Sequence, residues 1–192
     1  MDALTLIPSQ TALLVVDVQE RLMPAMHAPH AARLLACLDV LLEAARLFDL
    51  PVFATEQYPQ GLGPTVLAVR ERLASFDPPV HPVEKTVFSA LAPAEVARGL
   101  ASSGARSVIV TGVESHVCVF QTARELKRRG FHVHVPFDAV ASRDPQCREA
   151  ALALLARHGV SVTTTETVVF DLLGDAKSPH FRPLSKLVRA LV

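Results

Sequence analysis

The sequence predicts one α/β domain over residues 1–192, a three-layer α/β/α sandwich built on a mostly parallel, roughly six-stranded, Rossmann-like sheet. Two observations lead to this fold class. Short apolar segments, of the kind that form strands buried on both faces, alternate with segments of helical periodicity, and the connections between them are short. The chain has 192 residues, of which 50% are hydrophobic and 20% charged, which is enough for one complete core.

The predicted strands are short runs of apolar and β-branched residues that end at polar or turn-forming residues. In chain order they are residues 11–16 (TALLVV), 51–55 (PVFAT), 81–88 (HPVEKTVF), 107–111, 131–135 and 160–163. The third segment is extended because Asp77, Pro78 and Pro79 prevent a helix from continuing into it.

The predicted helices show apolar residues at a 3.6-residue spacing or begin with a proline that favours a helix start. They cover residues 30–48, 66–73, 93–102, a stretch from 117 onward, 145–158, 165–173 and 185–192. In the first helix, Leu34, Leu38 and Leu41 mark an apolar face that also carries Cys37. We therefore expect Cys37 to be a packing residue.

Composition excludes several classes of partner. Nineteen basic and nineteen acidic residues give a net charge of +0, so no bulk field attracts nucleic acid or an anionic membrane. No window reaches the roughly 18 apolar residues of a membrane span, and residues 1–10 lack the pattern of a secretion signal. The three cysteines are widely spaced without a C-x-x-C pair, which fits a reducing compartment. We expect a cytoplasmic protein with small-molecule partners.

Three chemically distinct residues follow predicted strands. Asp17 comes directly after residues 11–16, Lys85 lies in the extended segment, and Cys118 lies in the first turn of the helix that follows residues 107–111. Because carboxyl ends of parallel strands meet at one edge of a sheet, these side chains can converge there. A thiol, a proton-accepting carboxylate and a charge-stabilising ammonium group suffice for hydrolysis by covalent catalysis.

Each of these residues also has a structural interpretation. Asp17 could only cap the following turn, Lys85 could be an exposed surface lysine, and Cys118 could pack beneath a helix start. Cys147 also lies near a helix start, but it follows a turn rather than a central strand, and we interpret it as structural.

Longer segments resemble a known family, the isochorismatase-like cysteine hydrolases, which include nicotinamidases, N-carbamoylsarcosine amidases and isochorismatases. The resemblance rests on LLVVDVQERL, EKTVFSAL and VTGVESHVCVFQTARELKRRG, in this order. TEQYPQGLGPTV and GDAKSPHF further resemble the branch of isochorismatase-domain-containing proteins. The resemblance implies a catalytic triad of Asp17, Lys85 and Cys118, a cis peptide bond between Val113 and Glu114 that turns N–H groups toward an oxyanion, and a homo-oligomer.

Two departures from the family pattern restrict the class of reaction that the resemblance implies. Nicotinamidases of the family hold a metal through an aspartate and two histidines after the second strand, but here that segment reads TEQYPQGLGP and has no histidine. We therefore predict no metal and no other cofactor. Isochorismatases that cleave vinyl ethers lack a cysteine at the nucleophile position, whereas Cys118 is present here. The resemblance thus favours acyl or carbamoyl chemistry.

The sequence therefore predicts a cysteine hydrolase of a small amide, carbamoyl or related C–N substrate, with Gln19 and Tyr58 lining the pocket. The alternative is a catalytically idle protein of the same fold that binds a metabolite or serves as a scaffold. We further expect Lys85 and the helix N-terminus to lower the pKa of Cys118 by more than Asp17 raises it, which would make Cys118 the most reactive thiol at neutral pH.

Overall fold

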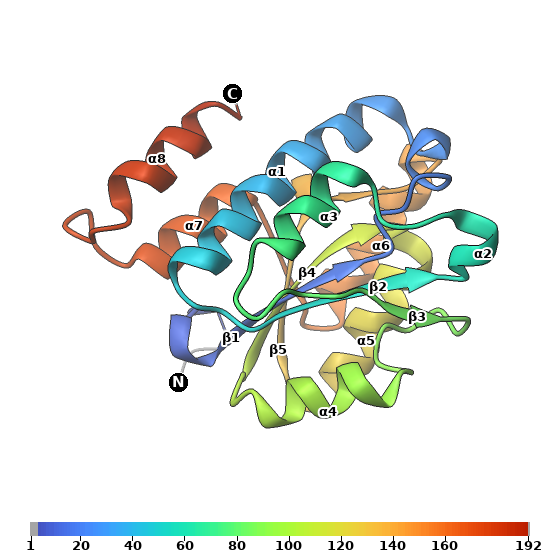
Figure 1. The fold of residues 1–192 in the computed structure, drawn as a ribbon, viewed down its shortest axis with the longest axis horizontal. Coiled ribbons are helices and arrows are strands. Elements are labelled where there is room, and N and C mark those ends of the chain that lie inside the picture. Colours follow the sequence, from blue (N-terminus) through green and yellow to red (C-terminus); the bar gives the residue numbers. More distant parts are fainter. Residues whose placement is uncertain (1–3, 192) are drawn as a thin grey trace.

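The segments predicted as strands form one parallel sheet in the computed structural model, which describes residues 4–191 (Figure 1). The strands are β1 (Thr11–Val16), β2 (Val52–Gln57), β3 (Val83–Lys85), β4 (Ser107–Val113), β5 (His132–Pro136) and β7 (Ser161–Thr163). A seventh strand in this part of the chain, the two-residue β6 (Val140–Ala141), was not predicted and pairs with β4. The predicted fold class is confirmed.

The strand order places β1 and β4 at the centre of the sheet. The order is β3-β2-β1-β4-β5-β7, so the chain runs outward from β1 to β3 and then returns to the other side of β1. In open parallel sheets, ligand sites lie beyond the carboxyl ends of the strands at such a reversal. At the end of β4, Gly112 has φ +116° and a Cβ atom there would lie 2.0 Å from the carbonyl oxygen of Val16. Only glycine allows this close approach.

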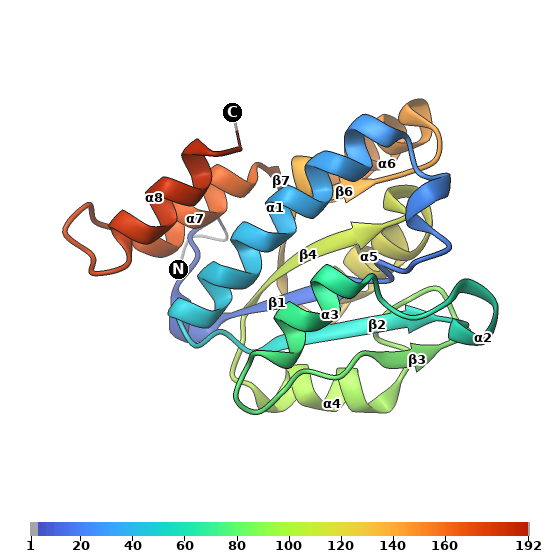
Figure 2. The ribbon, with the colours of Figure 1, turned by 45° about the horizontal axis from the view of Figure 1, so that its top comes forward.

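Helices cover both faces of the sheet, as Figures 1 and 2 show. One face carries α1 (Ala28–Leu47), α3 (Leu67–Ala74) and α7 (Thr165–Leu173), and the other carries α4 (Ala94–Ser102), α5 (Phe120–Arg128) and α6 (Pro145–Arg157). The helix α8 (Phe181–Arg189) packs outside α1 and α7. No helix within residues 4–191 has the length and apolar character needed to cross a membrane.

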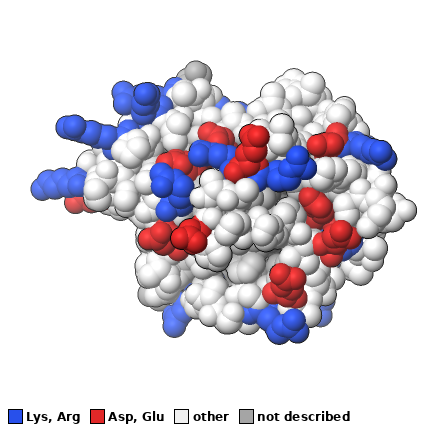
Figure 3. Space-filling model, viewed as in Figure 1, with Lys and Arg blue, Asp and Glu red and all other residues white. Residues whose placement is uncertain are grey.

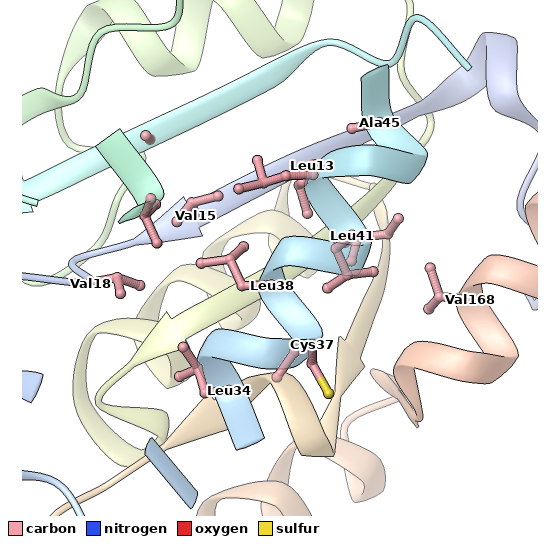
Figure 4. Close-up of a cluster of buried hydrophobic side chains, with 14 of the residues drawn as sticks. Leu13, Val15, Val18, Leu34, Cys37, Leu38, Leu41, Ala45 and Val168 are labelled. Atoms are coloured by element: carbon pink, nitrogen blue, oxygen red, sulfur yellow. The ribbon is translucent and has the colours of Figure 1, made fainter. Parts of the chain in front are cut away.

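The core between α1 and the sheet follows from the apolar spacing of that helix. Figure 4 shows Leu34, Leu38 and Leu41 on the side of α1 that meets the β1 residues Leu13 and Val15. Cys37 is completely buried in the same cluster, as expected from its position on the apolar face. Burial of this kind stabilises the fold by about 25 cal/mol per Å² of apolar surface.

Three local elements differ from the prediction. The helix expected from residue 117 begins as a π-helical turn, Ser115–Val119, and becomes α-helical only at Phe120. A one-turn helix, α2 (Pro59–Leu62), lies in a segment expected to be a loop. The last helix begins at Phe181 rather than residue 185, and the end expected for it, Val192, lies outside the described residues.

Candidate active site

The turn after β4 holds Cys118 at the reversal point of the sheet. All seven residues of β4 are buried, and the Val113–Glu114 peptide bond that follows is cis, as the resemblance implied. The carbonyl oxygen of Glu114 then accepts hydrogen bonds from the N–H groups of Val117 and Val119, at 3.0 and 3.2 Å. Cys118 lies within this turn and is 6% exposed. The thiol is therefore held at the carboxyl edge of the sheet with little access to bulk water.

Asp17 is fully buried beside this turn. It has a left-handed backbone conformation, with φ 53°, at the end of β1. One carboxylate oxygen accepts a hydrogen bond from Thr55 Oγ1 at 2.8 Å, and the other accepts one from Lys85 Nζ at 2.7 Å. These bonds fix the orientation of the carboxylate, and a mere turn-capping role would need neither of them.

Lys85 is a buried cation, so the interpretation as a surface lysine is wrong. Its side chain is 1% exposed and donates to Asp17 at 2.7 Å and to Gln57 Oε1 at 2.6 Å. The adjacent strands β2 and β3 bring Gln57 and Lys85 together as register partners. An ion pair desolvated to this degree costs free energy and is weak evidence for stability. It is a frequent feature of functional sites.

Both members of this pair act on the Cys118 thiol, but the acidity of the thiol differs from the expectation. Burial, and after it the negative charge of Asp17, raises the pKa of the Cys118 thiol to about 12, although the Lys85 ammonium group acts in the opposite direction. The predicted lowering of this pKa is therefore wrong. The physical reason is desolvation, which penalises the thiolate and which the sequence pattern did not reveal.

Ser142 and Arg143 contact the turn of residues 114–119 that holds Cys118, called the nucleophile turn below. The sequence pattern did not identify either residue. Arg143 donates to both carboxylate oxygens of Glu114, at 2.7 and 3.0 Å, and its own N–H donates to the same group at 3.1 Å. The His116 ring lies 3.0 Å from the hydroxyl of the fully buried Ser142. The Arg143 side chain is largely exposed and reads as an ordinary surface arginine in the sequence, so only the fold reveals these contacts.

Gln19 and Tyr58, the two predicted pocket residues, differ in their surroundings. Gln19 is fully buried, and its amide group donates to the carbonyl oxygens of Gln57 and Gly63 and accepts from the Gln57 N–H. It therefore holds the segment after β2 against the Asp17 loop. Tyr58 is exposed, has φ 39°, and its N–H donates to the carbonyl oxygen of Lys85 at 2.8 Å.

The residues after β2 do not fit the metal site of the nicotinamidase relatives. Among residues 4–191, no group of three or more His, Cys, Asp or Glu side chains converges in a way that could hold a metal ion. Glu56, the one acidic residue among residues 55–64, lies near the end of β2, and its Oε1 accepts hydrogen bonds from the N–H and the hydroxyl of Thr65, both at 2.6 Å. Its carboxylate is thus used within the loop.

Comparison with known proteins identifies relatives across nearly the whole chain. The family model "Isochorismatase domain" matches residues 11–167. Isochorismatase domain-containing protein 1 from Salmo salar is 39% identical over 96% of this chain, which spans 63% of the length of that relative. Isochorismatase domain-containing protein 2 from Bos taurus is 37% identical over 95% of this chain and 85% of its own. A solved structure titled as the MAR1 ribonuclease from Caenorhabditis elegans is 34% identical, with a TM-score of 0.87 over 96% of this chain and 92% of its own.

Proposed function

The chain belongs to the isochorismatase family, and we propose that it is a cysteine-dependent hydrolase of a small amide, carbamoyl or related C–N substrate. The observation that carries the proposal is the buried Asp17–Lys85 pair at the reversal point of the sheet, where both charges act on the Cys118 thiol. A buried ion pair offers little net stability over an apolar replacement, so its chemistry is the better explanation.

The first half of the proposed reaction forms a thioester. The thiol is neutral at rest because its pKa is about 12, so Asp17 accepts the thiol proton as sulfur attacks the substrate carbonyl carbon. Negative charge moves to the carbonyl oxygen, which backbone N–H groups between Glu114 and Cys118 receive. Asp17 then gives the proton to the departing nitrogen, and the C–N bond breaks.

The second half hydrolyses this thioester. Asp17 takes a proton from a water molecule, whose oxygen attacks the thioester carbon, and the C–S bond breaks as the proton passes to sulfur. The products are an acid and an amine, and the enzyme returns to its starting state. Lys85 orients the Asp17 carboxyl group through the 2.7 Å contact while Asp17 accepts and returns the proton.

The wider setting in this proposal is a cytoplasmic homo-oligomer of a single domain whose ligand is a small molecule. Three free cysteines support a reducing compartment. On the face shown in Figure 3, basic and acidic side chains are interspersed, which favours a small ligand over nucleic acid. The exposed side chains of Tyr58, Val87 and Phe88 supply apolar surface for contact with a second copy. Light scattering would give the assembly state.

A substrate screen with matched variants tests the proposal. Purified protein, Cys118→Ala and Asp17→Asn would be incubated with small amides, ureides and carbamoyl compounds, and with a short RNA because the Caenorhabditis elegans relative is titled a ribonuclease. We expect amine or ammonia release by the parent and by the control Cys147→Ala, no release by the two site variants, and an acyl adduct on Cys118 by mass spectrometry. Binding without turnover of any compound would instead favour the idle metabolite-binding protein.

A further inference from the structure

A cavity of about 260 Å³ has Val140, a residue of β6, in its wall. It is bounded by the N-terminal part of α1, the turn after β5, α6 and the start of α7, and its wall includes Arg33, Phe137 and Arg148. It contains none of the three proposed catalytic residues. Since a water molecule occupies roughly 30 Å³ of the liquid, the cavity has room for a small organic or inorganic ligand.

The cavity contains a buried cation without an anion. Arg148 is 8% exposed, and it donates only to two carbonyl oxygens, from Nε to Val140 at 3.1 Å and from Nη2 to Phe137. Among the described residues, no carboxylate lies within 4 Å of its guanidinium group and no acceptor bonds its Nη1 atom. Burial lowers the pKa of Arg148, as expected for a desolvated charge. Such a charge is costly unless a partner compensates it.

Asp138, an acidic residue in the cavity wall, does not form an ion pair with Arg148. Asp138 directs one oxygen to the N–H and hydroxyl of Thr165, at 2.8 and 3.0 Å, where it caps the N-terminus of α7. Its other oxygen faces Arg33 at 3.4 Å. The carboxylate is therefore engaged with α7 and Arg33. Its charge and that of Glu149 act on Arg148 from a distance, and among the described residues neither forms an ion pair with it.

A third basic group completes the lining. His30 lies on α1, and within residues 4–191 its buried Nδ1 atom has no hydrogen-bond partner. Burial, and then the positive charges of Arg148 and His27, lower the pKa of His30. Glu149 acts on the His30 pKa in the opposite direction, and the ring nitrogen of His30 that is unpaired within residues 4–191 can donate to a ligand.

We propose that this cavity binds a small oxyanion, a phosphate or carboxylate group, with Arg148 as its buried anchor and Arg33 and His30 beside it. The Nη1 atom of Arg148, which has no acceptor among the described residues, supplies the N–H donors for an oxygen of such an anion. The site is separate from the proposed catalytic centre, but Val140 of its wall belongs to β6, which pairs with Gly112 and Val113 below the nucleophile turn.

Calorimetric titration of the full chain tests this proposal, with inorganic phosphate and with succinate at an ionic strength held constant with sodium chloride. We expect saturable binding of at least one probe with a Kd of about 1 mM or tighter. Arg33→Gln should weaken it by about tenfold, and Glu166→Gln, which removes an exposed negative charge from the rim, should strengthen it by about threefold. Arg98→Gln removes an exposed charge on the opposite face and should leave the affinity unchanged.

The gain in Glu166→Gln cannot arise from a folding defect, so the variants distinguish binding from instability. Binding of phosphate alone or of succinate alone would identify the class of oxyanion. The absence of saturable heat for both probes up to about 20 mM, or equal affinities in the parent and Arg33→Gln, would overturn the proposal. Neither result depends on catalytic turnover, so it is independent of the proposed hydrolase activity.

Discussion

The variant Lys85→Met tests whether the Asp17–Lys85 ion pair is catalytic or only structural. The Lys85 and Asp17 side chains are 1% and 0% exposed, and their charged atoms are 2.7 Å apart. Methionine has a similar length and is apolar, so Lys85→Met fills the space and removes the charge. It leaves the Asp17 carboxylate buried with one neutral donor, Thr55 Oγ1.

The expected loss of stability follows from this unpaired charge. Removing one partner of a buried ion pair costs about 3–5 kcal/mol, whereas replacing both partners by neutral groups is often close to neutral. For a domain of this size, about 1 kcal/mol shifts Tm by roughly 2–4 °C, so Lys85→Met should melt about 6–20 °C below the parent at pH 7. The double variant Asp17→Asn with Lys85→Met should recover most of that loss.

Circular dichroism melts and turnover must be measured on the same preparations. We expect Lys85→Met to remain folded at 25 °C and to lose turnover by about 10²–10⁴-fold, the contribution of a positioned acid–base group. The double variant should regain Tm without regaining turnover. The exposed Lys177→Met is the matched control and should resemble the parent in both assays. Near-parental turnover in Lys85→Met would refute the proposed role, and an unchanged Tm would refute the desolvated pair.

Three further predictions concern the thiols and the support of the nucleophile turn. At neutral pH, iodoacetamide should label the partly exposed Cys147 first. Cys37 and Cys118 should react later, because their pKa values are raised to about 11 and about 12. Peptide mass mapping that found Cys118 labelled first would contradict this order. Because the folded-state pKa of Cys118 is raised above its usual 9.0, its neutral form contributes stability that is complete below pH 9 and is lost as the pH rises toward 12. Between pH 9 and 10.5 the unfolding free energy should therefore fall more steeply in the parent than in Cys118→Ala, by up to about 1.4 kcal/mol per pH unit, and equal slopes would oppose the assignment. Arg143→Gln should lower kcat by about tenfold and cost about 1–3 kcal/mol in urea unfolding, because the Glu114 carboxylate, in a residue that is only 8% exposed, loses two hydrogen bonds. Unchanged kcat would remove Arg143 from the positioning of the turn.

The fold was largely predictable because the spacing of apolar residues along the chain reflects which side chains are buried. The segment predicted over residues 11–16 is β1, and the helix predicted over residues 165–173 is α7. The two-residue β6 was missed because it has no length over which a pattern can repeat; its pairing with β4 creates it. The π-helical turn at Ser115–Val119 has no composition that distinguishes it from the start of an α-helix, and its wider winding depends on the geometry at the end of β4.

The members of the candidate site could be predicted from chemistry and position, but their environment could not. Asp17 follows β1, Lys85 is the last residue of β3 and Cys118 lies in the turn after β4, and the topology brings these three positions to one edge of the sheet. The contacts of Arg143 and Ser142 with the nucleophile turn form only when the folded chain brings their loop beside it, so no local sequence pattern predicts them. The sign of the Cys118 pKa shift was wrong because desolvation is a property of the whole packed structure rather than of neighbouring residues.

The raised pKa of Cys118 also decides between two ways of activating the thiol. With a pKa of about 12, only about one molecule in 10⁵ carries the thiolate at pH 7, so a mechanism that waits for a preformed thiolate would be slow. A carboxylate in contact with the thiol removes this obstacle, because the proton moves to Asp17 as charge moves from sulfur to the carbonyl oxygen. Charge inside the site is then transferred rather than created, which a desolvated environment favours. Burial that suppresses thiol reactivity toward simple alkylating agents is therefore compatible with catalysis on a bound carbonyl substrate.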